Sequence, residues 1–313
     1  MMRVKGQIKA RVKQDRQQMN SQSASAGKPD QTHVLERSAR PPDLTIRYGD
    51  LADHIADVHL PPPAVLTDAT FDYRKFFTIF IHGGFWKPQY DRAHTAPLAQ
   101  ALSAAGFVVC VPEYRRSAKV GGGWPDTFDD IAAAVGKLPG LVAEATGLVD
   151  PSSLVLAGHS AGGHLALWAA SRHRLPAGSP WRTEAASSYG VVALAGVSDL
   201  AACHRLNLGD GAVDTFLGGP QRYPDRYAAA DPAAMLPVGH RVRLIHGTTD
   251  DLVPPVMSTE YAERARAAGD ADVECILLPD TGHFELIDPL SEAWPAVEAA
   301  FRAVQPPVLR EGS

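Results

Sequence analysis

The sequence predicts an α/β fold in which a mostly parallel central sheet has helices on both faces. From about Asp43 onward, short apolar runs alternate with longer amphipathic stretches. Most of the short runs are continuously apolar, which is typical of parallel strands that are buried on both faces. Alternation of strands and helices implies crossover connections, and these place helices over the sheet.

The elements follow in chain order from local signals. Residues 77–81 are apolar, contain β-branched side chains and precede two glycines, which predicts a buried strand. A helical repeat over 93–105 ends at Gly106, and the strand 107–111 is closed by Pro112. A helix is predicted over 126–145, with acidic residues in its first turn. Further strands are predicted over 154–157, 191–194, 242–245 and 273–278, and further helices over 163–174, 256–268 and 291–304.

The domain organisation is predicted to be one α/β domain over 43–305. Residues 1–42 are predicted to be a disordered basic tail, because the first 16 residues hold six basic side chains against one acidic one and few apolar ones. Residues 199–238 interrupt the alternation and are rich in Gly, Pro, Asp and Tyr, which favours a short cap insertion. Residues 306–313 are expected to be a C-terminal tail.

Bulk composition excludes several classes of protein. The formal net charge of −5 argues against a nucleic-acid partner. The three cysteines form neither a metal-binding spacing nor a disulfide framework. The start of the chain lacks the apolar region of a secretory signal, and no run of about 18 apolar residues predicts a membrane span. We therefore expect a cytoplasmic protein with a small-molecule substrate and no metal; whether it forms a homodimer stays open.

The strongest local signal is Gly158-His159-Ser160-Ala161-Gly162, which fits the pattern G-x-S-x-G. It lies directly between a predicted strand and a predicted helix, the context in which this pattern forms a nucleophile elbow. The turn exposes the serine hydroxyl, and the start of the following helix faces developing negative charge. Ser160 is the predicted nucleophile.

A serine nucleophile needs a base, and the base needs an acid that orients it. Asp250 and His283 follow two later strands in the order Ser, Asp, His. Both lie at carboxyl ends of strands, where ligand sites form in open α/β sheets. Asp251 is the rival acid; Asp250 is preferred because it comes first after the strand turn. His246, at a strand end, is expected to be structural.

The second strong signal is His82-Gly83-Gly84-Phe85-Trp86, directly after the strand 77–81. Glycine-rich loops in this place supply backbone N–H groups to an oxyanion hole. The predicted donors are Gly84 and Phe85, together with Ala161 after the nucleophile. His82 is expected to brace the loop.

These motifs resemble those of the α/β-hydrolase superfamily from about Leu44 to Val304. The loop pattern HGG-x-W and the elbow with its helix, residues 158–166, are similar to the arylformamidase (kynurenine formamidase) group and related small esterases. The resemblance implies cofactor-free hydrolysis of N-formyl-L-kynurenine, or of small aryl and acyl esters. It transfers the nucleophile, acid and base to Ser160, Asp250 and His283, and the oxyanion loop to residues 82–86.

Two alternatives accompany this reading. One is a carboxylesterase, or an acetyl- or feruloyl-esterase; the other is an α/β-hydrolase scaffold that binds without catalysis. Aromatic side chains near the loop are candidates for the wall of a substrate pocket, and Trp86 is the predicted substrate contact. The other aromatic candidates are Phe85, Tyr114 and Trp124.

Overall fold

The computed structural model describes residues 31–67, 76–117, 122–184 and 190–305. The chain separates into two compact units, Met1–His33 and Val34–Ser313. The fold is that of the second unit. A short 3-10 helix, η1 (Gln31–Glu36), spans the boundary between them.

The second unit is built on an eight-stranded sheet within the described residues, with strand order β1-β2-β4-β3-β5-β6-β7-β8. β1 and β2 pair antiparallel, and β2 pairs antiparallel with β4. All neighbouring pairs from β4 to β8 are parallel, which confirms the predicted mostly parallel sheet. The strands are β1 (Leu44–Arg47), β2 (Ile55–His59), β3 (Phe77–Ile81), β4 (Val108–Pro112), β5 (Leu154–His159), β6 (Gly190–Leu194), β7 (Arg241–Gly247) and β8 (Val273–Leu278).

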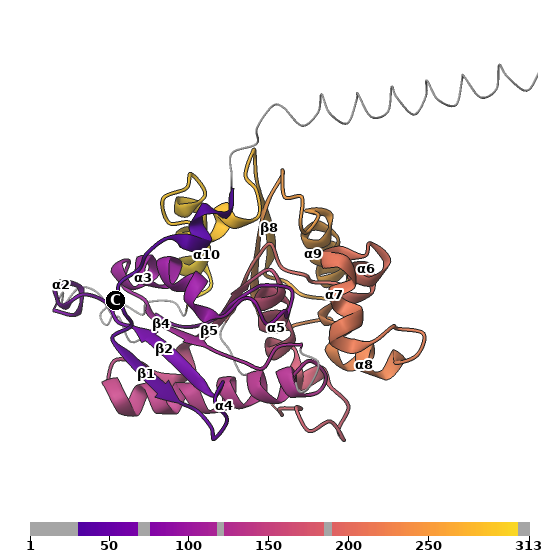
Figure 1. The fold of residues 1–313 in the computed structure, drawn as a ribbon, viewed down its shortest axis with the longest axis horizontal. Helices are drawn as coiled ribbons and strands as arrows, with labels where there is room; N and C mark the ends of the chain where they lie inside the picture. Colours follow the sequence, from indigo (N-terminus) through magenta and orange to yellow (C-terminus); the bar gives the residue numbers. More distant parts are fainter. Residues whose placement is uncertain (1–30, 68–75, 118–121, 185–189, 306–313) are drawn as a thin grey trace, which may run out of the picture. The chain divides into compact units, whose positions relative to one another are not determined.

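Helices cover both faces of this sheet (Figure 1). Alternate strand residues point to opposite faces: Ile79 and Ile81 belong to one core cluster and Phe80 to the other. The first cluster is shared with α4 (Asp126–Thr146), α5 (Ala161–Ala170) and α9 (Val256–Ala267). The second is shared with α3 (Ala96–Ala104) and α10 (Trp294–Ala303). The remaining short helices before β6 are α2 (Pro63–Leu66), η3 (Arg92–Thr95), η4 (Pro151–Ser153) and η5 (Arg172–Arg174), and η7 (Phe284–Ile287) follows β8.

Two strands, β1 and β2, have no counterpart among the predicted elements. Their sequences, LTIR and IADVH, mix polar and apolar residues, and the side chains of β1 are only half-buried or exposed. β1 is the edge strand of the sheet, where a strand faces solvent on part of its surface, and β2 is its neighbour, between β1 and β4. They therefore lack the continuous apolar run by which the central strands were predicted.

The N-terminal boundary of the second unit corrects the predicted tail of residues 1–42. Val34 is buried in the second core cluster, and Arg37 Nη2 lies 2.7 Å from Asp288 Oδ2. The segment from Val34 to Asp43 is therefore part of the compact unit. Residues 1–30 and 306–313 lie outside the described residues.

The predicted cap, residues 199–238, is a helical insertion between β6 and β7. It contains α6 (Leu200–Arg205), α7 (Leu208–Leu217), α8 (Pro224–Ala230) and η6 (Pro232–Ala234), which gather at one side of the unit (Figure 1). Asp199 caps α6 by accepting a hydrogen bond from the Ala202 N–H at 2.6 Å. No helix within the described residues is long and apolar enough to cross a membrane.

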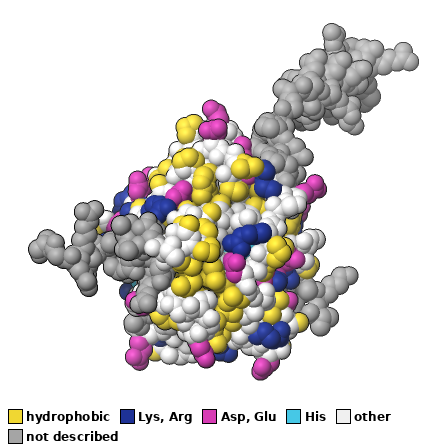
Figure 2. Space-filling view, turned by 90° about the vertical axis from the view of Figure 1, so that its left-hand side faces the viewer, with side chains coloured by type: hydrophobic (Ala, Val, Ile, Leu, Met, Phe, Trp, Pro, Cys, Tyr) yellow, Lys and Arg dark blue, Asp and Glu magenta, His cyan; other side chains and the backbone are white. Residues whose placement is uncertain are grey.

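Charges on one face of the molecule are mixed. Figure 2 shows basic and acidic side chains scattered among hydrophobic ones on the face that it presents.

Candidate active site

Ser160 occupies a sharp turn between the end of β5 at His159 and the start of α5 at Ala161. Its backbone is in a sparsely populated region, with φ 56° and ψ −120°. The turn requires close approach of backbones: a Cβ on Gly162 would lie 2.0 Å from the Ile81 carbonyl oxygen. The pattern G-x-S-x-G thus reflects a lack of space at the turn, and the turn sets the position of the Ser160 side chain.

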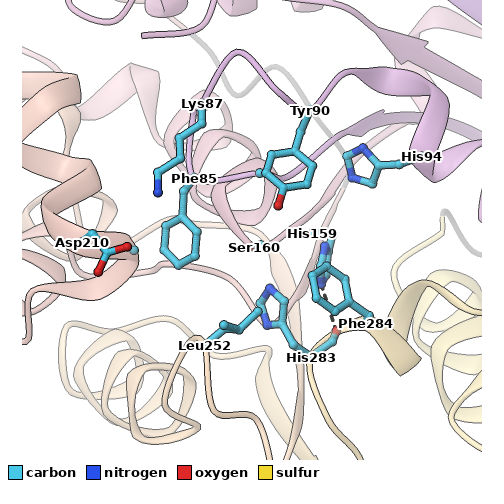
Figure 3. A pocket seen from close by; sticks show the side chains of 12 residues that line it. Phe85, Lys87, Tyr90, His94, His159, Ser160, Asp210, Leu252, His283 and Phe284 are labelled. Atoms are coloured by element: carbon cyan, nitrogen blue, oxygen red, sulfur yellow. Dashed lines mark hydrogen bonds between the residues drawn. The ribbon is translucent and has the colours of Figure 1, made fainter. Parts of the chain in front are cut away.

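His283 and Asp250 meet beyond the carboxyl ends of β8 and β7. His283 Nδ1 donates a hydrogen bond to Asp250 Oδ2 at 2.6 Å, and both side chains are buried. Because the carboxylate engages Nδ1, the other ring nitrogen, Nε2, is available as a base. Ser160 and His283 line the same cavity (Figure 3). The structure thus brings together the three residues proposed from the sequence as nucleophile, acid and base.

The surroundings of Asp250 favour its ionised form. Its Oδ1 accepts hydrogen bonds from the N–H groups of Leu252 and Val253, each at 2.9 Å. His246 Nε2 lies 3.2 Å from Oδ2. Burial raises the pKa of the carboxyl, but the hydrogen bonds from His246 and His283 outweigh burial, so the pKa lies well below its ordinary range. Asp251, the rival acid, is exposed, whereas Asp250 is buried and bonded to His283 Nδ1.

The predicted oxyanion loop lies against the nucleophile. A Cβ on Gly83 would be 2.8 Å from the His159 carbonyl oxygen and 3.1 Å from Ser160 Cβ. Gly84 and Phe85 have positive φ angles of 110° and 50°, and both line the cavity with Ser160. Ala161 is the first residue of α5, where a helix leaves its N–H groups without intrahelical partners. The predicted oxyanion loop and the start of α5 therefore both lie beside Ser160.

A buried ionic network braces this loop. His82 Nε2 lies 2.9 Å from Glu113 Oε1, and Arg116 Nη1 lies 2.7 Å from the same oxygen. The His82 ring stacks on Tyr114 with centroids 4.3 Å apart, and the Tyr114 hydroxyl donates to the His82 carbonyl at 2.9 Å. Burial raises the pKa of Glu113, but the hydrogen bond to His82 and the charges of His82 and Arg116 lower it to about 2. His82 thus has the bracing position expected from the sequence.

The cavity over Ser160 has a volume of about 220 Å³. Seven of its lining residues were not singled out by the sequence motifs. They lie a few residues beyond a motif residue or in the insertion, and no local pattern marks them. They are Lys87, Tyr90, His94, Gly209, Asp210, Leu252 and Phe284 (Figure 3).

Trp86 does not have the substrate-contacting position predicted for it. Its side chain is fully buried, and its ring stacks on Phe216 of α7 with centroids 4.6 Å apart and planes 2° apart. The positive φ of 55° at Trp86 belongs to the turn that carries this ring into the core. Of the other aromatic candidates, Phe85 lines the cavity, Tyr114 is buried against His82, and Trp124 packs on Phe128 and Trp181.

Gly162→Ala should destabilise the fold, because its Cβ would clash with the Ile81 carbonyl oxygen at 2.0 Å. We expect the free energy of unfolding to fall by about 2 kcal/mol or more, as in overpacked cores. Gly136→Ala is the matched control: Gly136 lies in α4 with no heavy atom within 4 Å of an added Cβ, so Ala should stabilise by about 0.5–1 kcal/mol. Urea unfolding measures the free energy of unfolding of both variants. Equal changes in the two would contradict the close approach of Gly162 to the Ile81 carbonyl.

Asp250→Asn should lower kcat on the order of 10⁴-fold, because the amide no longer fixes the His283 tautomer or stabilises its imidazolium. Asp251→Asn is the control and should keep most of the activity, since Asp251 is exposed. Steady-state kinetics on a p-nitrophenyl ester compare the two. The reverse ranking would identify Asp251 as the acid.

Glu113 should make stability depend on pH. Because its folded-state pKa of about 2 lies below the ordinary 4.5, its ionised form contributes stability above pH 4.5 that is lost as the pH falls toward 2. The gap in unfolding free energy between the wild type and Glu113→Gln should therefore be largest at neutral pH and shrink on acidification. Glu298→Gln, on the surface of α10, is the control. Denaturant titrations from pH 7 to 3 test this, and a gap that does not change with pH would refute it.

Comparison with known proteins gives relatives by sequence and by fold. The BD-FAE family matches residues 69–264. The probable carboxylic ester hydrolase LipM of Mycobacterium tuberculosis is 27% identical over 227 residues, 69% of this chain and 51% of that protein. Esterase LipQ of the same organism is 26% identical over 216 residues, 66% of this chain and 49% of that protein. The chain thus spans about half the length of these curated relatives.

Solved structures share the fold. A truncated form of a carbohydrate esterase from gut microbiota superposes with a TM-score of 0.67 at 21% identity, covering 85% of this chain and 99% of that one. Propionate-bound esterase 2 of Thermogutta terrifontis gives 0.61 at 21% identity, covering 83% and 91%. The fold is that of the α/β-hydrolases, and since the family match covers more than half of the sequence, the chain belongs to the BD-FAE family.

Proposed function

We propose that this protein is a serine hydrolase that cleaves small carboxylic esters through an acyl-enzyme. The observation that carries the proposal is the hydrogen bond of 2.6 Å between His283 Nδ1 and Asp250 Oδ2, with Ser160 and His283 lining one cavity. A base held by an ionised acid beside a serine on a strained turn is the arrangement that nucleophilic acyl transfer requires.

The reaction has two halves. His283 Nε2 takes the Ser160 proton as Oγ attacks the ester carbonyl, and Asp250 stabilises the resulting imidazolium. Backbone N–H groups of Gly84, Phe85 and Ala161 hold the oxyanion; one such donor contributes about 2.7–4 kcal/mol to lowering the barrier. His283 then protonates the departing alcohol. In the second half, water attacks the acyl-enzyme with the same proton transfers and releases the carboxylic acid.

The cavity supports a small acyl group. Its volume of about 220 Å³ lies below the ~300–1,000 Å³ of sites that take drug-sized ligands. Phe85, Tyr90 and Phe284 give it an aromatic wall, and Lys87 and Asp210 add one charge of each sign. We infer that the acyl chain is short.

The comparisons support ester cleavage over the formamidase activity that the loop resemblance implied. The relatives are named as a carboxylic ester hydrolase and an esterase. Trp86, which gave the loop its HGG-x-W form, lies in the core and not in the cavity. The carboxylesterase alternative is therefore the one we propose, with acetylated sugars among the substrates to be tested because a structural neighbour is named as a carbohydrate esterase.

The cavity predicts a steep dependence on acyl length. With p-nitrophenyl esters, kcat/KM for acetate or butyrate should exceed that for decanoate by about tenfold or more, because the excess methylenes do not fit. The same kinetic constants are measured for N-formyl-L-kynurenine and for an acetylated sugar. Ser160→Ala is the control and should lose both turnover and fluorophosphonate labelling. A preference for decanoate would contradict the small cavity, and faster turnover of formylkynurenine than of any ester would restore the formamidase reading.

A further inference from the structure

His159 directly precedes Ser160 and lies beside both the predicted oxyanion loop and the loop that carries His283. It ends β5, and its side chain is 1% exposed. A Cβ on Gly83 of the oxyanion loop would lie 3.2 Å from its Nδ1. On its other side, its ring lies 4.5 Å from the His283 ring (Figure 3). It therefore sits between the loop that offers oxyanion donors and the loop that carries the base.

One hydrogen bond fixes the orientation of this side chain. His159 Nε2 lies 3.0 Å from the backbone carbonyl oxygen of His283 (Figure 3, dashed). A carbonyl oxygen only accepts, so Nε2 must carry the proton and donate. The bond ties the backbone of the base to the strand that ends at the nucleophile. The ring of His283 is held separately by Asp250, so this residue has one anchor at its backbone and one at its ring.

The surroundings of His159 also keep it neutral. Burial lowers its pKa well below the ordinary value, and the nearby His283 and His94 lower it further. The hydrogen bond to the His283 carbonyl and the charge of Asp250 act in the opposite direction but do not outweigh burial. A neutral neighbour matters because His283 must accept a proton during the reaction, and a cation 4.5 Å away would oppose that.

We propose that His159 is a positioning residue for the base: as a neutral Nε2–H donor to the His283 carbonyl, it holds the imidazole of His283 at the distance from Ser160 that proton transfer requires. This inference rests on the proposed function, since it assigns His159 a part in activating Ser160. We expect loss of this hydrogen bond to affect kcat more than substrate binding, because the bond joins His159 to the backbone of His283.

The test compares two replacements. His159→Gln keeps an uncharged N–H donor at a similar reach, whereas His159→Leu removes the donor. With p-nitrophenyl butyrate, His159→Leu should lower kcat by about tenfold to a hundredfold with little change in KM, the size expected for misplacing a reacting group. His159→Gln should recover most of that loss.

His164 offers a matched control. It is also buried, on α5, and its Nε2 lies 2.9 Å from the Ala230 carbonyl oxygen, but it does not line the cavity. His164→Leu therefore removes the same kind of bond from the same region and should lower the melting temperature without a comparable fall in kcat. If His159→Leu retains wild-type kcat, or if His159→Gln is folded yet as slow as His159→Leu, the positioning role is wrong.

A measurement on the wild-type protein covers the case in which His159→Leu does not fold. Long-range ¹H–¹⁵N spectra of histidine-labelled protein should show His159 as the Nε2–H tautomer, unchanged between pH 8 and 5. A His159 that titrates near its ordinary pKa, or that carries its proton on Nδ1, would overturn the proposal. Wild-type protein that neither turns over esters nor reacts with a fluorophosphonate would instead refute the proposed function, while the spectra still report on the hydrogen bond.

Discussion

The close packing of backbones around Ser160 is the constraint on which the site depends. The turn at Ser160 brings α5 against the end of β3, where Gly162 leaves no room for a Cβ beside the Ile81 carbonyl. Because the oxyanion loop continues directly from Ile81, the same contact places that loop beside the nucleophile. The distance between the Ser160 backbone and the proposed backbone donors is therefore set by main-chain packing.

Main-chain packing does not fix the side chains of His283 and His82. Two buried carboxylates, Asp250 and Glu113, hold them instead. Asp250 is bonded by His283 and by backbone N–H groups, and Glu113 by His82 and Arg116. A buried carboxylate is tolerated only when several donors surround it, and removing one partner leaves an uncompensated charge. The groups proposed to act on substrate are thus preorganised before it arrives, which is the condition for electrostatic stabilisation of a transition state.

Local patterns were sufficient to predict the central strands and the order of the proposed catalytic residues. Most of the buried strands read as apolar runs, and the turn at Ser160 requires glycine two residues before and two residues after the serine. The edge strand β1 and its neighbour β2 gave no such signal because their sequences mix polar and apolar residues. The orientation of Trp86 could not be predicted, since it depends on Phe216, which is distant in sequence. Asp210 reaches the cavity only through the fold of the insertion.

The insertion between β6 and β7 contributes residues to the cavity, whereas the proposed catalytic residues come from other segments of the chain. The proposed catalytic groups follow β5, β7 and β8, whereas Gly209 and Asp210 at the cavity come from the start of α7. Gly209 has a φ of 59°, and a Cβ there would lie 2.8 Å from the Phe85 ring. Any side chain at this position would press on Phe85 and, through it, on the oxyanion loop. Mutation of the insertion can therefore change which substrates the proposed site accepts while the proposed reacting groups stay in place, and Gly209 is the position at which such divergence would begin to disturb the predicted oxyanion loop.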